Sequence, residues 1–236
     1  MRIAHLSIII ATVSILSSCQ QENFGLPNNE PTRLNTQEQR QAYALGAQVG
    51  HYLAEQNKKF QAHGIKLNKE YIMRGIVEAG NGHSLLTEKD AASLVKALHE
   101  MLESTQSNSA KVEGSEYLKE NAQRQGVKVT NSGLQYEVIV EGDGAKPNAN
   151  DRVKVHYHGI LPDGTVFDSS IDRRESITFG LNQVIKGWTE GLQLMSVGSR
   201  YRFVLPPDLA YGDRASGKIP ANSTLIFEVE LLDIEQ

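Results

Sequence analysis

The chain has 236 residues, of which 39% are hydrophobic and 22% charged, and this composition fits a globular protein of one large or two ordinary domains. The net charge of −4 and the lack of a basic block argue against nucleic acid as a partner. The only cysteine is Cys19, which excludes an internal disulfide framework.

Residues 1–18 have the pattern of a signal peptide. Arg2 supplies a positive charge, and the apolar run over residues 8–16 is too short to anchor stably in a bilayer. The small residues before Cys19 resemble the bacterial lipobox, which implies cleavage before this cysteine and acylation of its thiol. The alternative is a plain signal peptide cut near Ser18, which would leave a soluble periplasmic protein.

The residue after the cysteine is Gln20, not the aspartate associated with retention in the inner membrane. The lipobox resemblance therefore implies an outer-membrane lipoprotein that faces the periplasm and is held in the membrane only by its lipid. Residues 19–35 contain two prolines, several amides and few apolar side chains, and we interpret them as a tether.

The next stretch has helical spacing. Thr36 with Gln39 forms a capping box, and the apolar residues that follow predict a helix reaching about Phe60. Gly46 and Gly50 lie four residues apart in it, either as two tolerated glycines or as a site of close helix–helix contact.

Two further helices follow the first. Asn68 is a good N-cap and predicts a second helix reaching Gly80, and a third helix begins at Thr87. Beyond its first four turns the third helix becomes mostly polar, which permits one long helix to about Gln125 or two helices broken near residues 107–114. We prefer the long helix because no proline interrupts it.

Residues 36–102 offer only a thin core for three helices in one chain. The apolar side chains in excess are those of Tyr43, Leu45, Met73 and Met101. We therefore expect a homodimer formed through this region, so that residues 36–125 make a helical dimerisation domain with a long linking helix. The alternative is three helices that close on themselves.

From Gly126 onward the hydrophobic pattern has the period of strands. Strands are expected over residues 133–141, 152–160, 165–168, 176–180, 200–205 and 224–234. In the first, Leu134, Tyr136, Val138 and Val140 share one face; in the second, Val153, Val155, Tyr157 and Gly159 share one face and His156 and His158 the other. The long loop at 206–223 has the length of a functional loop.

The stretch Gln183–Met195 contains the only tryptophan, Trp188, on the apolar face of a short helix. Because strands are expected on both sides, we predict an α+β domain over residues 126–236, in which an antiparallel half-barrel sheet wraps around this helix. The indole is either an ordinary core residue or the floor of an apolar pocket.

Several blocks of the second half resemble the FKBP-type peptidyl-prolyl cis–trans isomerases. The blocks are VHYHG (155–159), DGTVFDSS (163–170), QVIKGWTEGLQLM (183–195), LAYGDR (209–214) and the terminal LIFEVELLDI. They occur in the family's order and cover about residues 126–236. The front half, with its YALG helix and the lead-in EYLKENAQRQGVKVTNSGLQY, is similar to the dimerising region of the macrophage infectivity potentiator subgroup.

The resemblance implies an apolar pocket for a prolyl ring. Carried over position by position, the pocket consists of Tyr157, Phe167, Asp168, Val184, Ile185, Trp188, Tyr211, Ile219 and Phe227. Trp188 would form the floor, and the other aromatic rings apart from Tyr211 would form the walls.

The resemblance assigns the catalytic positions to Asp168, beside the twisting amide, and Tyr211, which would donate a hydrogen bond to a substrate carbonyl. The backbone N–H of Ile185 would donate to another carbonyl. Without the resemblance, Asp168 could equally be a turn or cap carboxylate, and Tyr211 a loop aromatic packed on the domain.

Two departures from the family pattern concern the pocket rim. Ile177 stands where many relatives have an aromatic residue, and the loop 212–220 is charged and lacks the histidine of some relatives. Both leave open the preference for the residue before proline and the affinity for macrolides.

The resemblance implies an isomerase acting on proline-containing unfolded chains or peptides, with macrolides of the rapamycin type as inhibitors. We expect it to assist the folding of envelope proteins. No cofactor and no metal is expected. His156 and His158 offer two ligands without an evident third, so a solvated outer face is the simpler interpretation. The alternative function is a dimeric periplasmic chaperone or binding module in which isomerisation is incidental.

Overall fold

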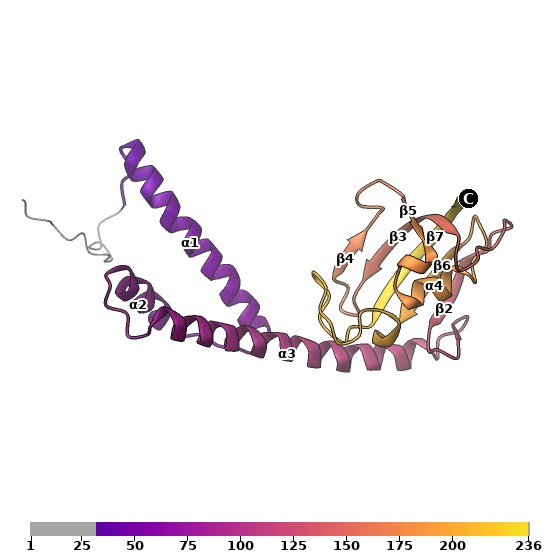
Figure 1. The fold of residues 1–236 in the computed structure, drawn as a ribbon, viewed down its shortest axis with the longest axis horizontal. Helices are drawn as coiled ribbons and strands as arrows, with labels where there is room; N and C mark the ends of the chain where they lie inside the picture. The colour runs from indigo at the N-terminus through magenta and orange to yellow at the C-terminus, as the bar shows by residue number, and fades with distance from the viewer. Residues whose placement is uncertain (1–31, 236) are drawn as a thin grey trace, which may run out of the picture.

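The computed structural model describes residues 32–235, so the predicted signal peptide and the lipidation site Cys19 lie outside the described residues. Three helices lead into a sheet domain (Figure 1). The helices are α1 (Gln37–Ala62), α2 (Lys69–Gly80), α3 (Glu88–Asn121) and α4 (Lys186–Leu192). The strands are β1 (Lys128–Val129), β2 (Gln135–Val140), β3 (Arg152–Ile160), β4 (Val166–Ser169), β5 (Ile177–Gly180), β6 (Arg200–Leu205) and β7 (Leu225–Glu235).

The helix starts predicted from capping residues are confirmed. Thr36 accepts a hydrogen bond from the N–H of Gln39 at 3.1 Å, and the Gln39 side chain accepts one from the N–H of Thr36 at 3.2 Å. The side chain of Asn68 accepts from the N–H of Glu70 at the start of α2, and that of Thr87 accepts from the N–H of Asp90 at the start of α3. Each cap satisfies N–H groups that have no acceptor within the first turn of a helix.

α3 is one unbroken helix of 34 residues, as preferred over two shorter helices. It ends at Asn121, four residues before the predicted end, and at a rise of about 1.5 Å per residue it is roughly 50 Å long. Gly126, with φ of 89°, follows the helix and turns the chain toward the sheet.

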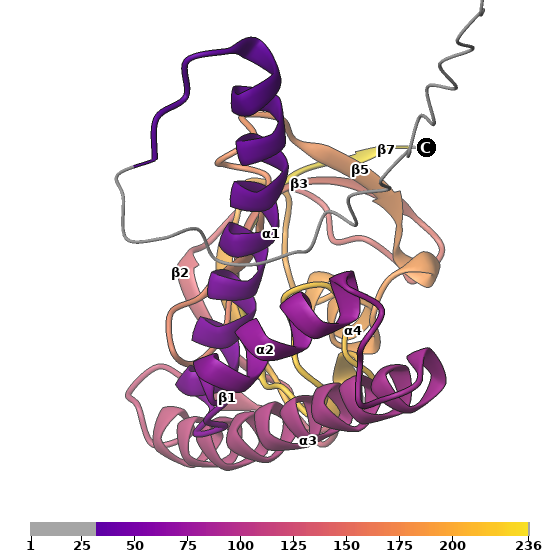
Figure 2. The ribbon, with the colours of Figure 1, turned by 90° about the vertical axis from the view of Figure 1, so that its left-hand side faces the viewer.

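The three N-terminal helices do not close on themselves within one chain. The only buried residues of α1 are Asn57 and Phe60 near its end, and α2 has none. Leu45 keeps 68% of its surface exposed, and α1 leaves α3 as a separate arm in both views (Figures 1 and 2). The alternative of a self-contained three-helix bundle is therefore wrong for the single chain.

All seven strands belong to one antiparallel sheet with the order β1-β2-β6-β7-β3-β4, and β5 also pairs with β3. The predicted inner face of β3 is confirmed, since Val153, Val155, Tyr157 and Gly159 are buried. These residues form one core with Trp188 and Leu192 of α4, so the sheet wraps around α4 as expected.

Two local predictions need correction, and one strand was not predicted. Val140 is exposed, because a bulge between Val138 and Val140 ends the alternation of β2. The stretch 183–195 is not helical throughout, since a 3-10 turn, η1 (Leu181–Gln183), precedes the short α4. The strand β1 was not predicted, because two residues are too few to carry a periodic pattern.

The loop after β6 contains a second 3-10 turn, η2 (Pro207–Leu209). Its later part folds back on itself through paired backbone hydrogen bonds of 2.9 Å between Ser216 and Ile219. Within residues 32–235, no helix has both the length and the apolar character needed to cross a bilayer.

Candidate active site

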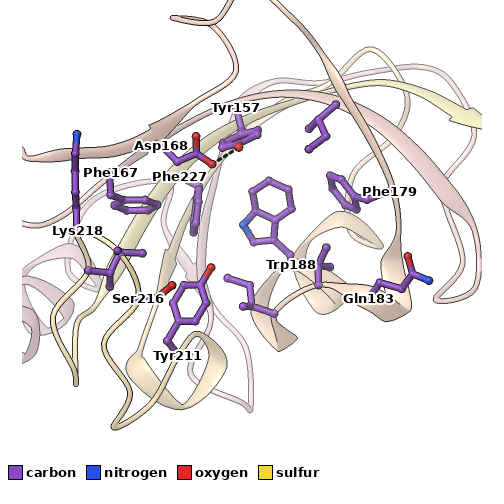
Figure 3. A pocket seen from close by; sticks show the side chains of 15 residues that line it. Tyr157, Phe167, Asp168, Phe179, Gln183, Trp188, Tyr211, Ser216, Lys218 and Phe227 are labelled. Atoms are coloured by element: carbon purple, nitrogen blue, oxygen red, sulfur yellow. Dashed lines mark hydrogen bonds between the residues drawn. The ribbon is translucent and has the colours of Figure 1, made fainter.

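The inner face of the sheet opens into a cavity of about 630 Å³ beside α4 (Figure 3). The cavity is lined by Tyr157, Phe167, Asp168, Ile177, Phe179, Gln183, Val184, Ile185, Trp188, Tyr211, Ser216, Gly217, Lys218, Ile219 and Phe227. All nine residues of the predicted pocket are among them, although they come from three strands, one helix and two loops. Their roles in binding and catalysis stay predictions.

Aromatic rings surround the single indole. The centroids of Tyr157 and Phe227 lie 5.2 and 5.1 Å from that of Trp188, at interplanar angles of 82° and 79°. Phe167 meets Phe227 edge to face at 5.4 Å. Edge-to-face contacts stabilise such a cluster beyond the burial of its area, so the walls of the cavity are held in place before any ligand enters.

Gly159 makes this aromatic arrangement fit. It lies on the inner face of β3, and a Cβ there would be 2.6 Å from Cε2 of Phe167 and 3.0 Å from Cε1 of Phe227. Two rings therefore occupy the space that a side chain at this position would need.

The Trp188 side chain is largely buried, but it forms part of the cavity wall. Only 7% of its surface is accessible, yet it lines the open space. Its Nε1 is buried and has no hydrogen-bond partner within residues 32–235. A buried donor without a partner costs about 1–3 kcal/mol, so this nitrogen needs an explanation.

Asp168 belongs to a three-membered network at the rim of the cavity. The Tyr157 hydroxyl donates to one carboxylate oxygen of Asp168, as Figure 3 shows, and Nη1 of Arg173 donates to the other. Nη2 of Arg173 also donates to the Tyr157 hydroxyl oxygen, at 2.9 Å. The Asp168 carboxylate is therefore held in one orientation from two sides.

The network changes the acidity of its members. Partial burial raises the pKa of Asp168, but the hydrogen bonds from Tyr157 and Arg173 and the guanidinium charge outweigh it and bring the pKa below its ordinary value. Burial and the bond to Asp168 raise the pKa of Tyr157. Asp168 is therefore an anion and Tyr157 a neutral donor throughout the physiological range.

The mouth of the cavity is formed by the loop after η2. Tyr211 is 41% exposed, with its ring on the side of the cavity opposite Asp168 (Figure 3). Nζ of Lys218 lies 3.5 Å from the carbonyl oxygen of Val166. Ile185 is the N-cap of α4, and the N–H groups at the start of a helix have no acceptors within it.

Several residues of the site were missed, among them Phe179 and Gln183, which line the cavity, and Arg173, which holds Asp168. The ring of Phe179 lies 5.2 Å from that of Trp188, at an interplanar angle of 48°. Phe179 shares a face of β5 with Ile177, so the period of two along this strand could have identified it. Arg173 was missed because it lies in the loop after β4, where no periodic signal exists.

The two histidines of β3 do not form a metal site with neighbouring residues. Nδ1 of His156 lies 3.0 Å from Oγ of Ser170, and Nδ1 of His158 lies 3.0 Å from Oγ of Ser169. Over the described residues, no group of three histidine, cysteine or carboxylate side chains has the geometry to hold a metal ion.

Comparison with known proteins agrees with this architecture. Residues 143–232 match the family model of the FKBP-type peptidyl-prolyl cis-trans isomerase, and residues 38–138 match that of the domain amino terminal to it. The chain belongs to the FKBP-type peptidyl-prolyl cis-trans isomerase family. It is therefore an enzyme that interconverts the cis and trans forms of prolyl peptide bonds.

Relatives match both halves of this isomerase. The chain is 41% identical over 251 residues to the FKBP-type peptidyl-prolyl cis-trans isomerase FkpA of Aeromonas hydrophila, covering 98% of this chain and 94% of the relative. It is 39% identical to the outer membrane protein MIP of Legionella longbeachae, with coverage of 88% and 90%. The crystal structure of FkpA from Escherichia coli matches with a TM-score of 0.65 and 37% identity, over 86% of this chain and 99% of that one.

Proposed function

We propose that the cavity over Trp188 binds the prolyl ring of the substrate and the amide bond before it. The observation that carries this proposal is the open cavity of about 630 Å³, walled by edge-to-face aromatic rings around the indole. The cavity is large enough for a prolyl ring together with the neighbouring peptide backbone. Its aromatic walls suit the apolar ring, and Asp168, Tyr211 and the other polar lining residues offer hydrogen-bonding groups to the backbone.

The physical basis for catalysis is loss of amide resonance. Rotation of a prolyl bond has a barrier of about 18–20 kcal/mol because the planar amide has partial double-bond character. The twisted amide has less charge separation than the planar one. An apolar site that excludes water therefore disfavours the planar ground state more than the twisted state, and each 1.36 kcal/mol of this difference is about tenfold in rate.

The polar groups at the rim would hold the backbone on either side of the twisting bond. Tyr211 would donate to one substrate carbonyl and the Ile185 N–H to another. The Asp168 carboxylate, fixed by Arg173, would face the twisting amide. The buried N–H of Trp188, which has no partner within residues 32–235, would gain one from the substrate.

Refolding of a model protein limited by a prolyl bond tests the site. Wild type should accelerate the slow phase, whereas Trp188→Leu should lose most of the acceleration because it removes the floor. Asp168→Ala should lose part of it. Equal rates for wild type, both variants and buffer would exclude the proposal.

We further propose that the helical arms form a homodimer. Large apolar side chains stay exposed on all three helices, among them Tyr43, Leu45, Tyr52, Tyr71, Met73, Leu94 and Met101. A second copy would cover this surface. Among residues 32–235, a Cβ at Gly46 or Gly50 would meet no atom within 4 Å, which leaves room for close contact there. Light scattering of the full mature chain would give the mass of two protomers, and a monomeric mass would exclude the dimer.

The domain boundaries follow from the separation between the N-terminal helices and the sheet. We propose a dimerisation domain with its linking helix over residues 36–125 and an isomerase domain over residues 126–236. The N-terminal pattern supports a periplasm-facing lipoprotein acylated at Cys19, with folding envelope proteins as substrates. The mass of the mature N-terminus distinguishes the acylated form from a plain cut near Ser18.

The exposed arms also favour a second function, a chaperone that holds unfolded chains between the two protomers. Suppression of aggregation by the full chain should then persist in Trp188→Leu, which has lost the pocket. Loss of suppression together with isomerase activity would oppose a separate chaperone function.

A further inference from the structure

Part of the cavity wall is a loop whose two ends are joined by a hydrogen bond. This segment, residues 212–222, is called the flap below. It supplies Ser216, Lys218 and Ile219 to the cavity and directly follows Tyr211. At its base, the Asn222 N–H donates to the Gly212 carbonyl oxygen at 2.8 Å. A contact that fixes Asn222 therefore also fixes the position of the flap and of Gly212, which follows Tyr211.

A side chain of the linking helix holds this point. Nδ2 of Asn222 donates a hydrogen bond of 2.8 Å to Oγ of Ser107 on α3. The two residues are 115 positions apart in the chain, and both are half-buried. Asn222 adopts a φ of 61°, in the left-handed region, where asparagine is among the few tolerated residues.

The rear half of α3 is fixed on the sheet, so Ser107 is a firm anchor. Gly114 lies against Thr224, and a Cβ at this position would come within 2.9 Å of Thr224 Cβ. Further along the helix, Arg202 donates from Nη2 to the Tyr117 hydroxyl at 2.6 Å. Thr224 is two residues after Asn222, so the helix contacts the chain at the flap base and again just after it.

We propose that Ser107 and Asn222 are positioning residues of the isomerase, through which the linking helix sets the flap over the substrate. This inference rests on the active site proposed above. Neither residue lines the cavity, so they act only through the flap. Because the flap carries rim groups and not the indole floor, losing the anchor should weaken substrate binding more than the rate of the bound substrate.

The test uses the full mature chain and a short peptide containing one prolyl bond. Ser107→Ala should raise KM about threefold to tenfold, matching the net free energy of one hydrogen bond, with kcat within about twofold of wild type. Asn222→Gly, which keeps the left-handed backbone accessible, should do the same. Ser107→Thr retains a hydroxyl and should restore most of the affinity.

Tyr117→Phe is the matched control, because it removes a hydrogen bond from the same helix at a point away from the flap. It should leave KM unchanged. Hydrogen exchange of the Asn222 N–H gives a readout that does not depend on activity. Exchange of this amide should accelerate in Ser107→Ala and not in Tyr117→Phe.

Unchanged KM and unchanged Asn222 exchange in Ser107→Ala would overturn the proposal. Equal effects of Ser107→Ala and Tyr117→Phe would also overturn it, since both would then reflect loosened docking of the helix. A failure of the active-site proposal would give a different set of results. In that case wild type shows no acceleration of isomerisation, and hydrogen exchange alone decides whether α3 holds the flap.

Discussion

The two halves of the chain differ in how they bury apolar surface. Among the described residues, the buried apolar side chains lie almost entirely in the sheet domain, and the helices before it contribute only Phe60 and Leu102. The sheet domain can therefore be stabilised by its own core, whereas the arms leave apolar faces uncovered. Stability and catalysis should reside in one half and assembly in the other.

α3 belongs to both halves. Its front turns carry exposed apolar residues such as Leu94 and Met101, while its rear turns contact the sheet through Gly114 and Tyr117. One unbroken helix therefore connects the arms to the sheet domain.

The largest expected effect concerns the floor of the cavity. Trp188→Ala should destabilise the sheet domain by about 3–5 kcal/mol, because it removes a large buried ring from a packed aromatic cluster. Isomerase activity should be lost with it. Chemical denaturation followed by circular dichroism should show the sheet domain of the variant unfolding at a lower denaturant concentration than in wild type. Light scattering at that concentration should still give the mass of the dimer. Dissociation at the same denaturant concentration as sheet unfolding would contradict the division into two halves.

A second prediction concerns the space between two rings. Gly159→Ala should cost about 1–3 kcal/mol, because the added methyl group overlaps Phe167 and Phe227. Moving these rings narrows the cavity, so kcat/KM for a proline-containing peptide should fall more than tenfold. A variant destabilised to the same extent with normal kinetics would show that these rings are not part of the binding site.

A third prediction concerns the arms. Leu45→Glu places a charge on the exposed apolar face of α1 and should raise the dimer dissociation constant by at least about tenfold. Activity toward a short peptide should not change, because the cavity lies in the other half. His51→Glu, at an exposed position about 120° around the same helix from Leu45 and about 80–100° from Tyr43 and Gly50, is the control and should leave the dimer intact. Equal weakening by both variants would point to a general charge effect.

The smallest expected effect is the dependence of stability on pH. Asp168 has a lowered pKa in the folded protein, so its ionised form stabilises the fold above the unfolded value of about 3.9, and this contribution disappears as pH falls through the folded pKa. Thermal melting of Asp168→Asn should therefore differ from wild type at neutral pH and converge with it once the pH falls below the folded pKa of Asp168. A constant difference over the whole range would contradict the ionised network with Arg173.

Periodic and capping signals identified most of the fold. The alternation along β3 placed Val153, Val155 and Tyr157 on the inner face, and Thr36, Asn68 and Thr87 marked the helix starts. Such signals come from neighbouring residues in the chain, so they cannot predict features that depend on contacts with distant segments. The bulge that exposes Val140 depends on pairing with β6, and no pattern within β2 announces it.

The residues of the candidate site were predicted from a different kind of signal, the resemblance to a known family. These residues lie far apart in the chain, and spacing alone left Trp188 as either core or pocket floor. The family resemblance predicted that the nine residues form one pocket, and all of them line the cavity. Arg173 and the hydrogen bond between Ser107 and Asn222 could not be foreseen, because both depend on loops and docking that no short-range pattern encodes.

The central claim is that prolyl bonds isomerise in the cavity over the indole. Exchange spectroscopy by NMR on a proline-containing peptide measures the cis–trans rate while the single indole N–H resonance of the protein reports on Trp188. The account predicts that this resonance shifts in a saturable way, with the same concentration dependence as the acceleration. Acceleration with an unmoved indole resonance would place the active site elsewhere.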